Sequence, residues 1–207
     1  MDKLPNVTIR LFRENDYGAV ASILVDSFMD KFYSLANLPK ETMIEFFKDS
    51  GIVGNRTFEG YWVAEANDEI LGVMLLKWKK QNRVKSHSNL SFVQLCQKYG
   101  FFKVIKLFLG LFVLSYEEIS DDECYIEHIA VSSESRGLGI GTKLINFGSR
   151  FVESTPGLNK YSLSVASSNK RAIDLYESLG FVLEKSKNSM ISKLLVNEGS
   201  WLYMVKH

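Results

Sequence analysis

The sequence predicts a protein of the α/β class (mixed α+β), and three observations predict that class. Residues 125–144 read as a buried strand, a glycine-rich turn and the first turns of a helix. Residues 61–78 read as two antiparallel strands joined by a tight hairpin. Several other segments repeat apolar residues at helical spacing, so helices should cover the sheet that these strands form.

Composition sets broad limits on function. The 207 residues are 46% hydrophobic and 24% charged, which is ordinary for a soluble globular protein. A net charge of +1 argues against bulk attraction to nucleic acid, so we expect no nucleic-acid partner. The first residues lack the pattern of a secretory signal, which predicts a cytoplasmic protein. Cys96 and Cys124 lack the paired spacing of a zinc site, so we expect two reduced packing residues and no metal.

In the first half of the chain, the pattern predicts a strand, two helices and the hairpin. The expected strands cover 7–12, 61–66 and 70–78, and the expected helices follow Asn15 or Asp16 and cover 40–48. The hairpin turn, Asn67-Asp68-Glu69, is the strongest local β signal in the chain.

Residues 79–122 separate the hairpin from the next strand and read as a helical insertion. Within it, 101–114 predicts an apolar helix on which Lys103, Lys106 and Gly110 form a narrow polar stripe. This helix is too short to span a bilayer, which needs about 20 apolar residues. We expect it to pack on the domain or in a homodimer interface. A lid over a substrate pocket and a contact with a membrane surface are the alternatives.

In the second half, the helix after the glycine turn should end at Pro156-Gly157. A further helix over 169–179 should be closed by Gly180. Strands are expected at 161–165, 181–187 and 201–205, with a polar turn at 193–199 between the last two.

The glycine turn has the composition of a phosphate site. Gly137, Gly139 and Gly141 let backbone amides approach a ligand, while Arg136 and the helix N-terminus add positive charge. A dinucleotide fingerprint fits poorly, because the third glycine comes one residue early. A nucleoside-triphosphate loop also fits poorly, because its lysine should precede the threonine. A turn without any ligand is the remaining structural alternative.

Two motifs then point to one family. The run Arg136-Gly137-Leu138-Gly139-Ile140-Gly141, followed later by 169–181, resembles the signature motifs of the GNAT superfamily of acyl-CoA-dependent N-acetyltransferases. The resemblance implies one domain over 1–207, with a central, mostly antiparallel twisted sheet flanked by helices and a helical insertion (about 79–122) between the third and fourth strands. It also implies acetyl-CoA as acyl donor. The expected cofactor-binding residues are Ile129, Ala130, Val131, Arg136, Gly137, Leu138, Gly139, Ile140, Gly141, Thr142, Asn169, Ala172 and Tyr176.

Acetyl transfer to an amine needs a base, because an amine with a pKa of about 10.4 is mostly ammonium at neutral pH. Glu127 is the first candidate, acting directly or through a water, and a surface or ion-paired role is its alternative. His128 is the reserve; it faces the other way in a regular strand, unless a bulge turns it. Backbone N–H groups of Ile129 or Val131 could stabilise the oxyanion.

Tyr176 resembles the general acid of the family, because its phenol could protonate the departing thiolate. Ala172 precedes it by one helical turn and leaves room for the cofactor arm. Asn169 could contact the same arm, and a helix N-cap would explain it without a ligand.

These residues predict an N-acetyltransferase that moves the acetyl group of acetyl-CoA to a primary amine by direct attack, without metal or covalent enzyme intermediate. The acceptor is open: a small amine, a peptide N-terminus or a lysine side chain. The alternative is a non-catalytic CoA-binding domain with a regulatory or partner-binding role, which a panel of amines would distinguish.

Overall fold

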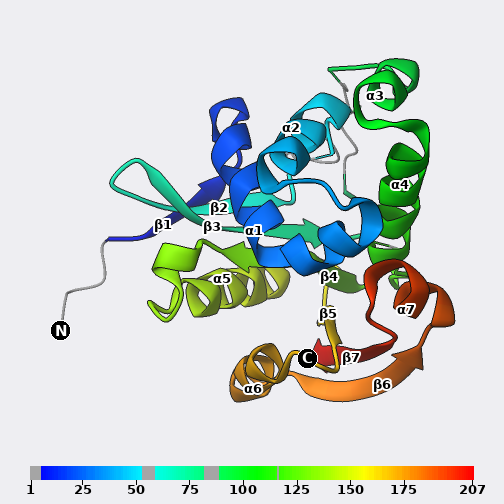
Figure 1. Ribbon diagram of the computed structural model, residues 1–207. Coiled ribbons are helices and arrows are strands. Elements are labelled where there is room, and N and C mark those ends of the chain that lie inside the picture. Colours follow the sequence, from blue (N-terminus) through cyan, green and yellow to red (C-terminus); the bar gives the residue numbers. More distant parts are fainter. Residues whose placement is uncertain (1–5, 53–58, 82–88, 116) are drawn as a thin grey trace.

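The computed structural model describes residues 6–52, 59–81, 89–115 and 117–207 (Figure 1). Its strands form a seven-stranded sheet in the order β1-β2-β3-β4-β5-β7-β6. Every pair is antiparallel except β4 with β5, so the mixed α/β class and the mostly antiparallel sheet are confirmed. The strands are β1 (Thr8–Leu11), β2 (Tyr61–Ala66), β3 (Glu69–Lys77), β4 (Glu123–Val131), β5 (Lys160–Ala166), β6 (Val182–Asn188) and β7 (Ser200–Lys206). The α-helices are α1 (Tyr17–Ala36), α2 (Lys40–Ser50), α3 (Phe92–Tyr99), α4 (Phe101–Ser115), α5 (Ile140–Ser154), α6 (Lys170–Ser178) and α7 (Met190–Val196).

The sheet carries a hydrophobic core on each face, because side chains alternate along its strands. On β3, Val73 and Leu75 pack into the core that α1, α2 and α4 cover. Met74 and Leu76 pack into the opposite core, which α5 and α6 cover. Figure 1 shows α1 and α2 on one side of the sheet and α5 on the other.

The β2–β3 hairpin turns where predicted, but its loop is one residue shorter than expected, because Glu69 already belongs to β3. Ala66 pairs with Glu69, so Asn67 and Asp68 form a two-residue loop. Both residues have positive φ, 51° and 62°, as a type I′ turn requires.

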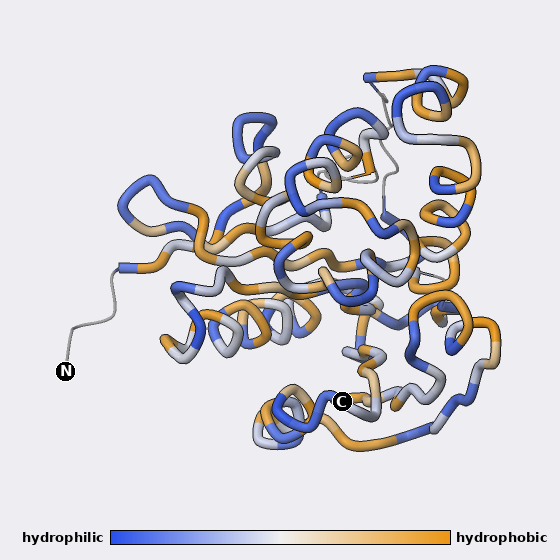
Figure 2. The backbone as a smooth tube through the Cα atoms, viewed as in Figure 1, coloured by the Kyte–Doolittle hydropathy of each residue, from blue (hydrophilic) through white to orange (hydrophobic). Residues whose placement is uncertain are grey.

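The insertion between β3 and β4 is helical, as expected, and contains α3 as well as α4. The polar stripe predicted on α4 is wrong at Gly110, which is buried against α1, while Lys103 and Lys106 are exposed. A β-carbon at Gly110 would lie 2.3 Å from Leu35 Cδ2, so the glycine allows the two helices to pack closely. Figure 2 shows how largely hydrophobic α4 is.

Two short helices were not predicted. α3 begins with a capping box, in which Ser91 Oγ accepts from the Gln94 amide and the Gln94 side chain accepts from the Ser91 amide. The polar turn expected at 193–199 is wrong in its first half, because α7 runs to Val196. Apolar side chains on α7, such as Met190 and Leu194, are exposed, so α7 lacks the buried apolar residues at helical spacing that normally predict a helix.

In the ranges that the structure describes, no helix is long and apolar enough to cross a membrane. Cys96 is half-buried, Cys124 is buried, and both are free thiols in the structure. Burial raises the pKa of the Cys124 thiol to about 12, which leaves it unreactive at neutral pH.

Candidate active site

Strands β4 and β5 separate along their length and open a V in the sheet. Their pairing begins at Glu123 with Lys160 and ends at Ile126 with Leu163. Beyond that point β4 continues to Val131 and β5 to Ala166 without pairing to each other. A cavity of about 1050 Å³ is lined by the diverging strands and by residues of α1, α4, α6 and α7. We call it the β4–β5 cavity.

Backbone groups face this opening from both strands. On β4, Ser132 donates to the Leu71 carbonyl of β3. Hydrogen-bonded pairs alternate in an antiparallel ladder, so the N–H groups of Ile129 and Val131 point away from β3, toward β5. On β5, the Ser167 amide donates to the Ser200 carbonyl beside β7. By the same alternation, the backbone N–H and C=O groups of Ser164 and Ala166 point toward β4. Polar backbone groups thus border the V on both sides.

Glu127 is the extra residue of a β-bulge. Leu75 of β3 pairs with His128, and Leu76 pairs with Ile126, so no residue of β3 lies opposite Glu127 in the backbone register. The Glu127 side chain is 10% exposed and lines the cavity. Its Oε2 lies 2.5 Å from Lys77 Nζ, so the two side chains form an ion pair. The geometry of this contact is not that of a hydrogen bond, and Oε2 is buried. The bulge and the lysine together hold a carboxylate at the opening.

The bulge also changes where His128 points. A regular strand would place Glu127 and His128 on opposite faces, but both line the β4–β5 cavity. The His128 Nε2 atom lies 2.9 Å from the Tyr61 hydroxyl. Burial, together with the nearby Lys77 charge, lowers the pKa of His128 to about 3, so the imidazole is neutral at physiological pH.

Tyr176 enters the cavity from α6. Its ring is 8% exposed and packs against Phe181 with 5.9 Å between centroids. Burial raises the pKa of the phenol to about 12, so it stays protonated at neutral pH. The helix is fixed at its start by Asn169, whose Oδ1 accepts from the Ala172 amide at 3.2 Å. Asn169 therefore caps α6 and also lines the cavity.

The glycine turn lies at the end of β4 and begins α5. Gly137 and Gly139 have φ of 85° and 73°, a conformation that favours glycine, and a β-carbon on either would meet nothing within 4 Å. In the described part of the chain, no backbone oxygen accepts from the amides of Gly137, Gly139, Ile140, Gly141 or Thr142. Free amides at a helix N-terminus form an anion site. Arg136 Nε lies 3.4 Å from the Val131 carbonyl and Nη2 3.5 Å from Ser27 Oγ.

The structure brings part of the predicted set together. Glu127, His128, Ile129, Asn169 and Tyr176 line one cavity. The other predicted residues lie outside its lining: Ala130 is buried in the core that α1 covers, Arg136 contacts the Val131 carbonyl at the end of β4, and Val131, the glycine turn and Ala172 line no part of the cavity.

The cavity residues that the sequence analysis did not predict include Lys31, Glu117 and Ser164. The Ser164 hydroxyl donates to Glu117 Oε2 at 3.2 Å, and Glu117 also pairs with Lys187. Nothing in the local pattern predicts that the segment before β4 folds back on β5 and β6. For Lys31 a signal existed, since it follows the small polar Ser27 by one turn on an otherwise apolar face.

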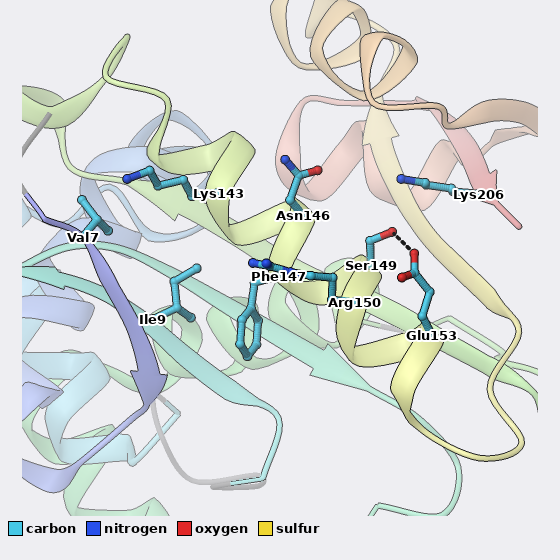
Figure 3. Close-up of a pocket in the computed structure, with 9 residues that line it drawn as sticks. All are labelled: Val7, Ile9, Lys143, Asn146, Phe147, Ser149, Arg150, Glu153 and Lys206. Carbon is cyan, nitrogen blue, oxygen red and sulfur yellow. Dashed lines mark hydrogen bonds between the residues drawn. The ribbon is translucent and has the colours of Figure 1, made fainter.

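A second cavity, of about 640 Å³, lies on the outer side of α5 (Figure 3). Lys143, Arg150 and Lys206 surround it, and Ser149 Oγ lies 3.5 Å from Glu153 Oε1 at its edge. It shares no lining residue with the β4–β5 cavity. Among the described residues, no cluster of histidine, cysteine and acidic side chains could hold a metal ion.

These features define a mixed α/β protein with a cavity between two diverging parallel strands and a glycine-rich turn with free amides at the start of α5. Residues 19–181 match the model of the acetyltransferase (GNAT) family. Because that match spans most of the chain, the protein belongs to the GNAT family.

Individual relatives agree over shorter or more distant matches. A thialysine N-epsilon-acetyltransferase of Bos taurus is 41% identical over 71 residues, which is 34% of this chain and 41% of the relative. The chain thus matches less than half the length of that protein. An N-acetyltransferase from Staphylococcus aureus Mu50 has the same fold, with a TM-score of 0.66 and 23% identity, over 96% of this chain and 100% of that one. The Naa50 of Arabidopsis thaliana, solved with the bisubstrate analogue CoA-Ac-MVNAL, aligns with a TM-score of 0.52 and 16% identity, over 97% of this chain and 98% of that one.

Proposed function

We propose that the protein is an acetyl-CoA-dependent N-acetyltransferase that acts on a primary amine by direct attack. The observation that carries this proposal is that Glu127 of the bulge and Tyr176 of α6 line the same cavity, from strand and helix on either side of the V. A carboxylate and a protonated phenol in one cavity supply the base and the acid that the reaction needs. The family match supports the same activity.

In this proposal the cofactor's pyrophosphate binds the free amides of Gly137, Gly139, Ile140, Gly141 and Thr142, with Arg136 beside them. The pantetheine arm lies in the V, where the polar backbone groups of β4 and β5 can hydrogen-bond its amides. The thioester then lies near the bulge, and the N–H of Ile129 or Val131 stabilises the oxyanion.

The proton moves through two side chains. Glu127, directly or through a water, removes the proton of the incoming ammonium, so the amine can attack the thioester carbon. Collapse of the tetrahedral species breaks the carbon–sulfur bond, and Tyr176 donates its hydroxyl proton to the thiolate. Burial keeps that phenol protonated, which suits an acid. No residue forms a covalent bond with the acetyl group in this scheme.

We propose only the chemical class of the acceptor, not its identity. The Bos taurus relative is named for thialysine, and the Arabidopsis structure holds an analogue that ends in the peptide MVNAL. Small amines and peptide N-termini are therefore the first acceptors to test, followed by lysine side chains. The cytoplasmic location and the homodimer stay predictions from the sequence.

Two measurements test the function. Calorimetry with acetyl-CoA should show saturable binding, and its absence would sink the cofactor assignment. A panel of amines and peptides incubated with the protein and acetyl-CoA should yield a product heavier by one acetyl group. Binding without transfer to any amine would favour the non-catalytic CoA-binding alternative.

A further inference from the structure

Lys31 places an ammonium in the β4–β5 cavity. It lies on α1, three residues after Phe28. The helix is kinked at Phe28, whose φ is −123° and ψ 17°. The Nζ of Lys31 lies 4.7 Å from the centroid of the Trp201 ring and 5.4 Å from that of Phe28. Two aromatic faces thus hold the cation by cation–π contact. The indole of Trp201 is itself fixed, because its Nε1 donates to Ser192 Oγ at 3.0 Å.

The other charged groups of the cavity have partners. Glu117 pairs with Lys187, and Glu127 pairs with Lys77. In the described part of the chain, Lys31 forms neither an ion pair nor a hydrogen bond to a protein oxygen. The acidic group that acts on it from a distance, Glu198, is itself bonded to the Ser168 hydroxyl.

An ammonium has three N–H donors, and aromatic faces are weak acceptors for them. Burial lowers the pKa of Lys31, and the charge of Glu198 offsets part of that effect. An anionic group in the cavity would supply both the charge and the acceptors that the protein leaves out.

We propose that Lys31 binds a carboxylate of the acceptor, so that the acceptor is an amine that also carries a carboxylate, such as a free amino acid with a side-chain amine. This inference rests on the proposed function and adds the substrate class. The acceptor's amine would reach Glu127 at the bulge while its carboxylate meets Lys31 on α1, and the two ends would orient it across the V.

The anion could instead belong to the cofactor. Ser27 lies four residues before Lys31 and contacts Arg136, which borders the phosphate-binding turn. Trp201, however, packs with the core on the α1 face, whereas the turn begins α5 on the opposite face. We therefore assign the anion to the acceptor, and the test separates the two sources.

The test is calorimetry on the protein saturated with CoA, using L-lysine and cadaverine, which differ only in the carboxylate. The wild type should bind L-lysine roughly 10- to 100-fold more tightly than cadaverine, as a charge-assisted contact implies. In Lys31→Met, which keeps the straight apolar stem between the rings, that ratio should fall to about one. Lys31→Arg should keep the preference, and so should Lys106→Met, a matched change of an exposed lysine outside the cavity.

Equal wild-type affinities for the two ligands would overturn the proposal, as would a ratio that Lys31→Met leaves intact. A Lys31→Met protein that binds CoA itself much more weakly assigns the anion to the cofactor and also overturns it. These readouts do not need turnover. Binding of L-lysine through Lys31 without acetyl transfer would contradict the proposed function while supporting this inference.

Discussion

Lys77 Nζ on β3 lies 2.5 Å from Glu127 Oε2 on β4, so the carboxylate at the bulge is matched by a cation from the neighbouring strand. Lys77 Nζ also lies 3.4 Å from the Ser115 carbonyl at the end of α4. One lysine therefore connects the candidate base to the helical insertion.

Replacing Glu127 by glutamine should lower kcat/KM roughly 100-fold at neutral pH, because the amine then loses its proton acceptor. The deficit should shrink as the pH rises toward the amine's own pKa of about 10.4, where the neutral amine becomes abundant. A pH series of initial rates for both proteins measures this.

His128→Gln is the matched control at the next residue. The pKa of His128 is lowered to about 3 by burial, so its imidazole is too weak a base to hold the ammonium proton. This variant should lose less than about tenfold in kcat/KM. A larger loss in His128→Gln than in Glu127→Gln would move the base to His128.

Tyr176→Phe should lower kcat roughly 100-fold while leaving the affinity for acetyl-CoA close to that of the wild type. The phenol has a pKa of about 12, raised by burial, so it stays protonated below that value. The ratio of wild-type to variant kcat should therefore stay flat between about pH 7 and 9.5. Stopped assays with a thiol reagent at each pH measure it, and a variant as fast as the wild type at every pH contradicts the general-acid role.

Several elements that the sequence predicted correctly carry a local chemical signal. Asn67 and Asp68 favour the positive φ of the hairpin turn, and Asn169 caps α6 with its own side chain. α7 also has a local cap, because Ser189 Oγ accepts from the Ser192 amide at 3.1 Å, but its apolar residues show no buried helical pattern. Ser192 Oγ donates to the Glu198 carbonyl at 2.6 Å and accepts from Trp201, so contacts with the following turn and with β7 hold it.

The candidate site divides in the same way. Glu127 and Tyr176 were found from motifs within single segments, as was the glycine turn. Lys77 and Glu117 were missed, because their roles arise only when the bulge, the insertion and β5 come together in space. The separation of β4 from β5 after Ile126 likewise involves two strands far apart in the sequence, so no local pattern predicts it.

Gly137→Ala and Gly139→Ala should each weaken CoA binding roughly tenfold, measured by calorimetry. Both glycines have left-handed φ, and an added methyl group on either would project into open space beside the turn. The backbone strain alone costs about 1 kcal/mol of stability. Gly157→Ala is the matched control, because its φ is 88° and its surroundings are equally open, but it lies after α5, away from the turn. If all three variants bind CoA alike, the turn does not hold the cofactor.

Glu123 should make the sheet sensitive to acid. Its carboxylate, 2% exposed, accepts from the Tyr203 hydroxyl at 2.6 Å, the Ser120 amide at 3.0 Å and the Ser162 hydroxyl. Burial alone would raise the pKa of Glu123, but these hydrogen bonds lower it below its ordinary value. The stability it adds is therefore present above the unfolded-state pKa and lost as the pH falls through the folded-state value. Glu123→Gln should cost about 2 to 3 kcal/mol at pH 7 in urea unfolding, and less near pH 4. An equal cost at both pH values would show that packing, not the charge, holds β4, β5 and β7 together.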